Sequence, residues 1–152
     1  VQRLLSSGGI ATEASFTPDG KALLFSSDRG GSPQIYRLTI ATGAVERMTF
    51  EGGHNVSPRA TPDGKGFVFV RRDGGRFMIA IQDYATRQVQ LLTPGPLDES
   101  PSIAPNSKLI IYAAQQGQRG ILAGVSSDGR VKQRLVSPAA DVREPAWGPL
   151  PR

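Results

Sequence analysis

The chain has 152 residues, a formal net charge of +5 and no cysteine. That length suffices for one domain with its own core, and the lack of cysteine excludes disulfides, thiolate metal sites and cysteine nucleophiles. No apolar run approaches the roughly 20 residues of a membrane-spanning helix, and Lys and Arg are scattered, so we expect neither membrane insertion nor a nucleic-acid partner.

Turn-forming residues are abundant, with 18 glycines and 12 prolines. This composition favours many turns and few long helices. Short runs rich in β-branched and aromatic residues follow the turn signals, namely ALLFSS (22–27), GFVFVR (66–71) and LIIYAA (109–114). Such runs bounded by turn residues are typical of strands in an all-β fold.

The first predicted unit covers about residues 13–49. Its strands are expected at about 13–17, 22–27, 34–40 and 44–49. The pentapeptide TPDGK (17–21) predicts the hairpin between the first two, because Pro presets φ, Asp bonds its own backbone and Gly accepts positive φ. Asp19 is therefore expected to shape a turn rather than to catalyse.

The second and third predicted units, 57–93 and 100–136, repeat this pattern. The turn prolines Pro18, Pro62, Pro105 and Pro149 are spaced by 44, 43 and 44 residues, and five residues before them stand Glu13, Ser57, Ser100 and Glu144. The further strands are expected at about 57–61, 66–71, 77–83, 88–93, 100–104, 108–114, 120–126 and 131–136. A period of about 40–45 residues with four short strands is typical of a β-propeller blade.

Single strands are expected to flank the three units, at 3–6 and 144–148. The second strand of each unit is apolar without alternation, as in Leu23–Phe25, so both its faces should be buried by neighbouring blades. Three blades would leave two faces and several strand edges bare. We therefore predict an all-β partial β-propeller that belongs to a larger ring, or that pairs with a second copy or a companion chain.

Several segments carry a family resemblance. EASFTPDGKALLFSSDRGGSPQIYRLTIATGAVERMTF resembles the blade repeat of the TolB family, the periplasmic propeller proteins of the Tol-Pal system in Gram-negative bacteria. LDESPSIAPNSKLIIYAAQQG and the terminal EPAWGPLPR are similar to the last blades of that family. The resemblance implies a periplasmic, non-catalytic protein with a six-bladed propeller and a small α/β domain, of which the domain and the first blades lie outside this chain.

The resemblance also implies the partners. In this family the mouth of the propeller channel binds Pal, the peptidoglycan-associated lipoprotein, and bacteriocin translocation-domain peptides compete there. In proteins of this family the extreme N-terminus binds TolA. Because that part of the protein is expected to lie outside this chain, the chain is expected to lack the TolA contact. The general blade motif is shared with prolyl-oligopeptidase-type peptidases, so a propeller that gates a hydrolase domain on a larger chain remains the alternative.

Binding is expected at the loops that join the last strand of one blade to the first strand of the next. These loops, FEGGHN, PGPLDES and SPAADVRE, run inward to the channel and are acidic, while the RRDGGR and QQGQRG loops of the same face are basic. The candidate partner-binding residues are Glu51, His54, Asn55, Leu97, Asp98, Glu99, Asp141, Arg143 and Glu144. We predict an acidic mouth with a basic surround that attracts a polar partner by charge, the alternative being ordinary loop polarity.

The residues of these loops do not form a catalytic or zinc-binding set. His54 is the only histidine, and the chain has no GxSxG elbow to present a serine. Asp98 and Glu99 are adjacent, so in extended chain their side chains diverge. We predict neither enzyme activity nor a cofactor; the carboxylates at the mouth suit Ca²⁺, but no loop has the spacing of a calcium-binding loop.

Overall fold

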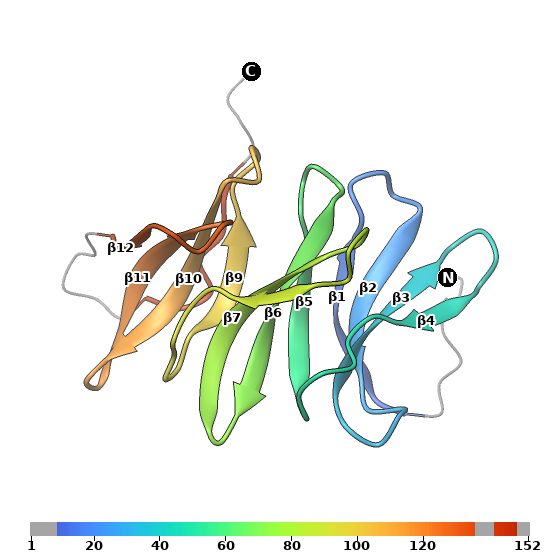
Figure 1. Ribbon diagram of the computed structural model, residues 1–152, viewed down its shortest axis with the longest axis horizontal. Helices are drawn as coiled ribbons and strands as arrows, with labels where there is room; N and C mark the ends of the chain where they lie inside the picture. The colour runs from blue at the N-terminus through green and yellow to red at the C-terminus, as the bar shows by residue number, and fades with distance from the viewer. Residues whose placement is uncertain (1–8, 136–141, 149–152) are drawn as a thin grey trace.

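The computed structural model describes residues 9–135 and 142–148. The described residues form no helix, and their strands make three antiparallel sheets of four strands each, paired in chain order (Figure 1). The strands of the first sheet are β1 (Ala11–Phe16), β2 (Ala22–Ser27), β3 (Gln34–Thr39) and β4 (Val45–Arg47). Those of the second and third are β5 (Asn55–Ala60), β6 (Gly66–Asp73), β7 (Arg76–Asp83), β8 (Val89–Leu91), β9 (Glu99–Ile103), β10 (Leu109–Gln116), β11 (Arg119–Ser126) and β12 (Lys132–Arg134).

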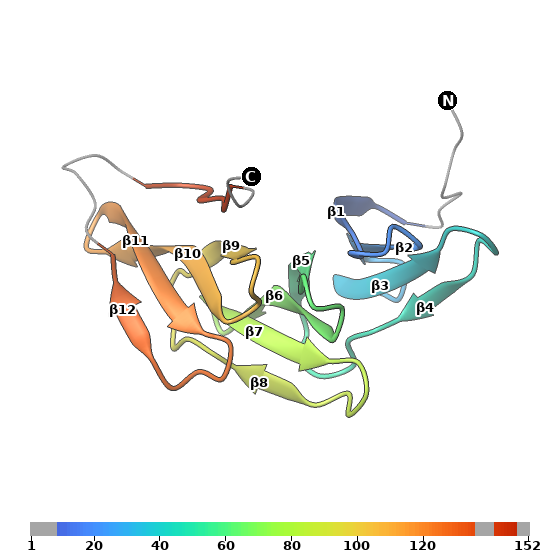
Figure 2. The ribbon, with the colours of Figure 1, turned by 90° about the horizontal axis from the view of Figure 1, so that it is seen from above.

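The three sheets are arranged as blades of a propeller. Seen from above, they fan out along an arc, with β1, β5 and β9 on its inner side and β4, β8 and β12 on its outer side (Figure 2). This arrangement confirms the predicted all-β partial propeller with three four-stranded blades. No membrane-spanning helix is found in the part of the chain that is described.

The repeated TPDGK turns form the hairpins between the first two strands of a blade. In the first blade the Asp19 carboxylate accepts hydrogen bonds from the Thr17 hydroxyl (2.7 Å) and the Lys21 amide (3.0 Å). These two bonds favour the ionised carboxylate, so they lower the pKa of Asp19. Gly20 takes a φ of 68° that a side chain would disfavour, so the motif acts as a turn.

The blades pack on each other through both faces of their second strands. Phe67 and Phe69 of β6 lie in one apolar cluster with Leu24 and Ile35 of the first blade. Val68 and Val70, which point to the opposite face, lie in another cluster with residues of the third blade, among them Ile110, Tyr112 and Val125. The core therefore consists of layers between blades, as the non-alternating apolar runs predict.

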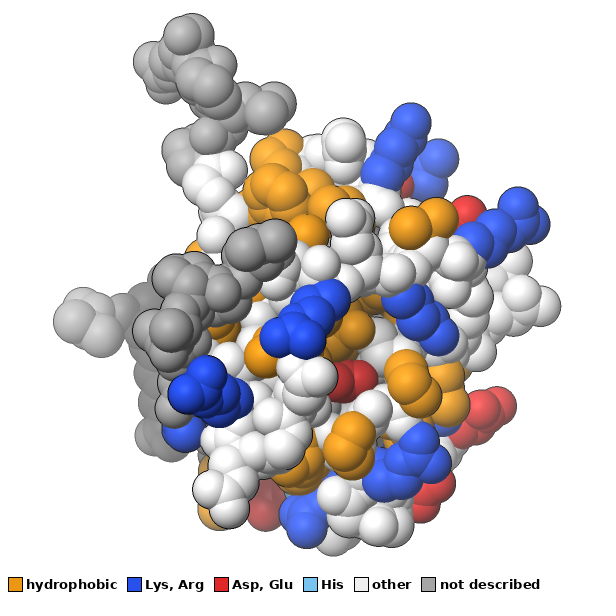
Figure 3. Space-filling model, turned by 90° about the vertical axis from the view of Figure 1, so that its left-hand side faces the viewer, with side chains coloured by type: hydrophobic (Ala, Val, Ile, Leu, Met, Phe, Trp, Pro, Cys, Tyr) orange, Lys and Arg blue, Asp and Glu red, His pale blue; other side chains and the backbone are white. Residues whose placement is uncertain are grey.

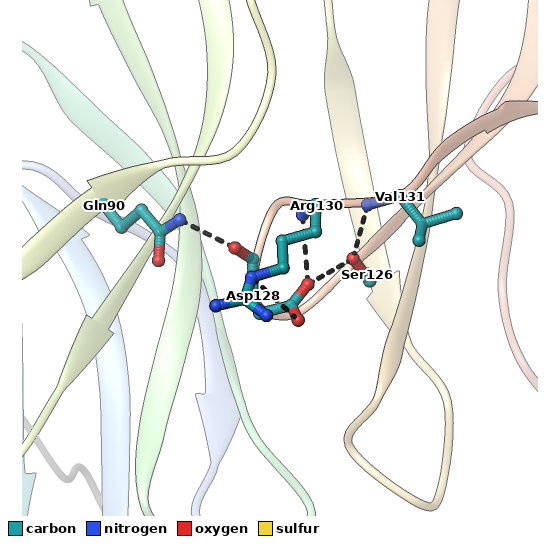
Figure 4. A network of polar contacts seen from close by, with 5 residues as sticks. All are labelled: Gln90, Ser126, Asp128, Arg130 and Val131. Atoms are coloured by element: carbon teal, nitrogen blue, oxygen red, sulfur yellow. Dashed lines mark hydrogen bonds and ion pairs between the residues drawn. The ribbon is translucent and has the colours of Figure 1, made fainter.

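Polar side chains add a second kind of link between blades. The buried Gln82 amide donates to the Met48 carbonyl of the first blade (2.9 Å). On the other side, the Gln90 amide of β8 donates to the Asp128 carbonyl in the turn after β11 (2.9 Å; Figure 4). The Asp128 carboxylate holds that turn by accepting from the Ser126 hydroxyl (2.5 Å) and the Arg130 amide (3.0 Å).

A surface ion pair joins the first and second blades, with Glu46 Oε1 2.9 Å from Arg87 Nη2. Both side chains are more than half exposed, at 54% and 56%. Because water screens the pair, Glu46→Ala is expected to lower the free energy of unfolding by less than about 1 kcal/mol. A double-mutant cycle with Arg87→Ala in urea denaturation measures the coupling, and a coupling above about 2 kcal/mol would contradict this weak role.

The segment after the third blade follows the path of an inner strand. The structure assigns no strand at 144–148, because an inner strand pairs only with the second strand of its own blade, and none lies there in the described chain. The Val142 amide nevertheless donates to the Gly120 carbonyl (3.1 Å), and the Trp147 amide donates to Ser102 Oγ (3.0 Å). The predicted strand at 3–6 lies outside the described residues.

The two ends of the arc have no blade beside them among the described residues. On the side formed by the third blade, hydrophobic side chains are exposed between Lys and Arg residues (Figure 3). Val131 in this blade is 60% exposed, and Ile10 and Phe16 at the first blade are 69% and 61% exposed. Exposed apolar side chains at both ends are consistent with blades that stack on further structure.

Candidate functional site

The inner strands share one unusual backbone conformation. Glu13, Ser57 and Ser100 have φ values of 55°, 55° and 53°, and Glu144 in the terminal segment has 47°. Positive φ is costly for residues other than glycine, and here it accompanies a break in strand register. These residues stand five positions before each turn proline, so the sequence repeat corresponds to a repeated backbone feature of the inner edge.

Glu13 uses this conformation to bridge two blades. Its carboxylate accepts hydrogen bonds from the Ser57 amide (2.9 Å) and the Ser57 hydroxyl (2.8 Å). It also accepts a longer bond from the buried Ser26 hydroxyl (3.3 Å). The inner edges of the first two blades are therefore tied together by one side chain.

Two cavities lie along this inner edge. The inner cavity has a volume of about 510 Å³, and the rim cavity beside it has about 170 Å³. Both are lined by Glu99 and Arg143. The inner cavity is also lined by Glu13, Ser57, Ser100 and Glu144, and the rim cavity by Leu97, Gln115 and Gln118. The structure thus brings oppositely charged side chains of two segments into one mouth cleft, our name for the two cavities together.

The other candidate residues lie apart from this cleft. Glu51, His54, Asn55 and Asp98 line neither of its cavities, and Asp141 lies outside the described residues. Glu51 is exposed and His54 is half-buried, in the loop between β4 and β5. The sequence-based selection missed Glu13, Ser57 and Ser100 as cleft residues, although their shared spacing before the turn prolines marked them.

Asn55 is fully buried at the start of β5 and serves as a hub. Its amide group donates to Gln34 Oε1 (2.8 Å) and to the Glu51 carbonyl (2.9 Å), and its oxygen accepts from Arg71 Nε (3.2 Å). Gln34 Oε1 also accepts from the Thr49 hydroxyl (2.6 Å). A side chain enclosed in this way shapes the loop that precedes it and does not itself reach a partner.

Asp98 occupies the corresponding repeat position at the start of the third blade and is also buried, at 4% exposure. One of its carboxylate oxygens accepts from the Gly95 amide (3.0 Å). Burial disfavours the charged carboxylate and raises the pKa of Asp98 above 3.8, although hydrogen bonds from Thr93 and Gly95 oppose the shift. Glu99 beside it is exposed, so the two acidic side chains diverge as predicted.

Asp98→Asn is expected to raise the melting temperature near neutral pH. Because the raised pKa means that the folded chain holds the proton more tightly than the unfolded chain, the native state loses stability as the pH rises above about 3.8. A neutral amide removes this cost and keeps an oxygen for the Gly95 amide. Thermal unfolding at about pH 7 and about pH 3.5 checks this, since the advantage of the variant should vanish at the lower pH; a variant less stable near pH 7 would contradict it.

The predicted basic loop RRDGGR lies in the hairpin formed by β6 and β7. Arg71 and Arg72 stack over Phe69 and Phe77, with the guanidinium carbons 5.9 and 5.2 Å from the ring centroids. Arg71 is half-buried and Arg72 is exposed. Within the described residues, no three His, Cys, Asp or Glu side chains come close enough together to hold a metal ion.

A further cavity is lined mainly by residues of the turns within the blades, together with Glu51 of the loop between β4 and β5. It has a volume of about 870 Å³ and is lined by turn residues of both charges, including Asp63, Lys65 and Arg87. Arg87 is already paired with Glu46. This cavity holds no arrangement of side chains that points to a particular ligand, so the candidate site remains the mouth cleft and its loops.

Comparison with known proteins connects this arrangement to a family. A family model described as the TolB beta propeller domain matches residues 1–151. The Tol-Pal system protein TolB of Bordetella pertussis is 53% identical over 152 residues, which cover 100% of this chain and 35% of that protein. The TolB of Nitrosospira multiformis is 59% identical over 120 residues, covering 77% of this chain and 28% of the relative.

Solved structures agree with the sequence relatives. The crystal structure of TolB from Acinetobacter baumannii superposes with a TM-score of 0.88 at 49% identity, covering 96% of this chain and 37% of that one. The crystal structure of puromycin hydrolase covers 92% of this chain and 24% of its own, with a TM-score of 0.71, but at 13% identity it shows the fold alone. The chain spans about a third of the length of the TolB of Bordetella pertussis. It belongs to the TolB β-propeller family.

Proposed function

We propose that the chain is part of a non-catalytic binding scaffold of the Tol-Pal system in the periplasm. Its mouth cleft would bind Pal, and bacteriocin translocation-domain peptides would compete for the same place. The observation that carries this proposal is the mouth cleft, where Glu99 and Arg143 line two adjoining cavities at the inner edge of the blades.

The chemistry of the cleft favours a polar protein segment as the ligand. Glu13, Glu99 and Glu144 supply carboxylates, Arg143 supplies a guanidinium, and Leu97 adds apolar surface at 38% exposure. Such a mixture offers a peptide both charge complementarity and an apolar contact. The Ser100 hydroxyl can pair with backbone groups of an extended segment, and Ser57 Oγ, which donates to Glu13, can still accept from a backbone amide.

The loop between β4 and β5 extends this surface. Glu51 and His54 are accessible there, so we include them among the contacts. Asn55 and Asp98 are assigned a different role: as buried side chains with bonds to their own loops, they preserve the shape of the surface. We keep Glu144 as a contact because it lines the inner cavity.

Charge reversal in the cleft tests the proposal. In the natural full-length protein that contains this sequence, Glu99→Lys and Arg143→Glu are each expected to weaken the binding of soluble Pal about tenfold, because like charges across an interface are repulsive. Titration calorimetry gives the affinity, and displacement by a bacteriocin translocation peptide shows whether the sites are shared. Glu46→Lys, an exposed charge reversal on an outer strand, is the control.

Two results would overturn the proposal. The first is an unchanged Pal affinity in both cleft variants while the native fold is retained. The second is an equal loss of affinity in the Glu46→Lys control, which would indicate a general effect of net charge rather than a binding site. Direct binding of the bacteriocin peptide that persists in a cleft variant unable to bind Pal would show that the two ligands use different contacts.

A further inference from the structure

One hairpin lies between the two loops that lead to the mouth. The first mouth loop, residues 50–55, joins the first blade to the second, and the second mouth loop, residues 94–98, joins the second blade to the third. The hairpin between them is formed by β6 and β7, which pair from Gly66 with Asp83 to Asp73 with Arg76. Arg71 lies near the end of β6 and Arg76 lies at the start of β7. Each of these arginines contacts one of the two loops.

Arg71, near the end of β6, holds the first mouth loop at two points. Its Nη2 donates to the Glu51 carbonyl (3.1 Å) and its Nε donates to Asn55 Oδ1 (3.2 Å). The loop lies close to the guanidinium. A Cβ added to Gly52 would be only 3.1 Å from Arg71 Nε. The next amide of the strand, that of Arg72, donates to the His54 carbonyl (2.9 Å).

Arg76, at the start of β7, contacts the second mouth loop in a corresponding way. Its Nη2 donates to the Pro94 carbonyl. The Phe77 amide donates to the Pro96 carbonyl (2.7 Å), and the Phe77 carbonyl accepts from the Asp98 amide (3.1 Å). Leu97, which lines the rim cavity, bridges to Phe77 in the same region.

We propose that Arg71 and Arg76 are positioning residues that hold the first and second mouth loops in the geometry that a partner binds. The inference rests on the proposed function, which makes these loops and the cleft the binding surface. Arg71 would act through Glu51 and His54, and Arg76 through Leu97 and Glu99. Neither arginine needs to touch the partner.

The bonds of the two arginines are separate from the contacts that hold the fold together. The fold is held by apolar layers between blades, whereas the arginine bonds lie at a half-buried and an exposed side chain. The exposed Arg76 bond contributes little to the free energy of unfolding, whereas loss of the Arg71 guanidinium also removes the donor to Oδ1 of the buried Asn55 and so lowers stability. A loop held in its bound shape, however, spares the partner the cost of ordering it. Loss of Arg76 should therefore affect binding more than stability, and loss of Arg71 should affect both.

The test compares three methionine variants, which keep the aliphatic stem and remove the guanidinium. Arg71→Met and Arg76→Met are each expected to weaken Pal binding about tenfold in the natural full-length protein. The melting temperature should change little in Arg76→Met and should fall in Arg71→Met, which also leaves the buried Asn55 Oδ1 without its donor. Arg130→Met is the matched control, because it removes the same charge from an exposed side chain in the turn after β11, outside both mouth loops. Arg71→Lys should restore only part of the affinity, because Lys lacks the two-pronged geometry.

Double-mutant cycles distinguish positioning from direct contact. His54→Ala should lose its effect on affinity in the Arg71→Met background and keep it in the Arg76→Met background, and Leu97→Ala should behave in the opposite way. Equal coupling of both arginines to both loops, or no coupling, would overturn the assignment. An affinity loss as large in Arg130→Met would do the same.

A second readout does not depend on any partner. Hydrogen exchange of the backbone amides at 51–55 should speed up in Arg71→Met, and that at 95–98 should speed up in Arg76→Met, each without change in the other loop. If exchange is unaltered in both variants, the positioning role is refuted even where Pal binds. If the loops loosen as expected but the wild-type protein does not bind Pal, the positioning role stands and the proposed function fails.

Discussion

Phe69→Ala should lower the free energy of unfolding by about 3–5 kcal/mol. Phe69 is fully buried in the layer between the first and second blades, and its ring centroid lies 5.6 Å from that of Phe67. Truncation removes most of the side chain from a layer whose walls belong to different blades. Because each wall is held by its own hydrogen-bonded sheet, the layer cannot collapse to fill the space, so the cavity persists.

Urea denaturation followed by far-ultraviolet circular dichroism measures this loss. Phe50→Ala is the matched control, since Phe50 is 64% exposed and is expected to change the free energy of unfolding by no more than about 0.5 kcal/mol. Comparable losses in the two variants would mean that the layer between blades is not the main source of stability. A loss for Phe69→Ala below about 1 kcal/mol would lead to the same conclusion.

Asn55→Leu should lower the free energy of unfolding by about 2–4 kcal/mol, because each buried polar group left unpaired costs about 1–3 kcal/mol. The change removes the bonds to Gln34 Oε1, to the Glu51 carbonyl and from Arg71 Nε. Partial compensation is available, since Gln34 Oε1 keeps the Thr49 hydroxyl and the Glu51 carbonyl keeps Arg71 Nη2. Leucine has a similar volume, so the loss reports on the polar network rather than on a cavity.

Thermal and urea unfolding provide the measurement, with Asn106→Ala as the control. Asn106 caps one amide, that of Lys108, in an exposed turn (3.0 Å), and its loss should cost about 1 kcal/mol or less. If Asn55→Leu is as mild as the control, the hub does not hold the first mouth loop. The same variant should also weaken Pal binding, since Glu51 and His54 lie in that loop.

The strand pattern could be predicted closely because it depends on local features. The predicted strands at 22–27, 66–71 and 120–126 correspond to β2, β6 and β11, of which β6 runs on to Asp73 and β11 begins at Arg119. The bounds of the outermost strands are predicted less well. The sequence predicts a strand at 44–49, but β4 covers only Val45–Arg47. An outer strand pairs on one side only, and here the chain leaves the sheet early to cross to the next blade.

Side-chain exposure in the mouth loops could not be predicted from residue type. Asn55 and Asp98 are polar and stand in loops, so surface positions were the natural expectation, yet both are buried. Their burial depends on partners that come from distant residues, such as Gln34 and Arg71 for Asn55. Glu13 was not selected from the sequence, yet it lines the cleft. Its carboxylate lies there because it accepts hydrogen bonds from Ser57, which is one full repeat away in the sequence.

The amino-acid sequence was sufficient for the repeat, the strand types, the turns and the need for blades to stack, because each depends on residue spacing and on apolar runs within a few positions. The identity of the cleft residues and the division between contact and positioning roles were decided only in three dimensions. A backbone that turns to positive φ at Glu13, Ser57 and Ser100, and hydrogen bonds between residues a blade apart, determine which side chains meet. Such contacts depend on how neighbouring blades align, which local spacing does not encode.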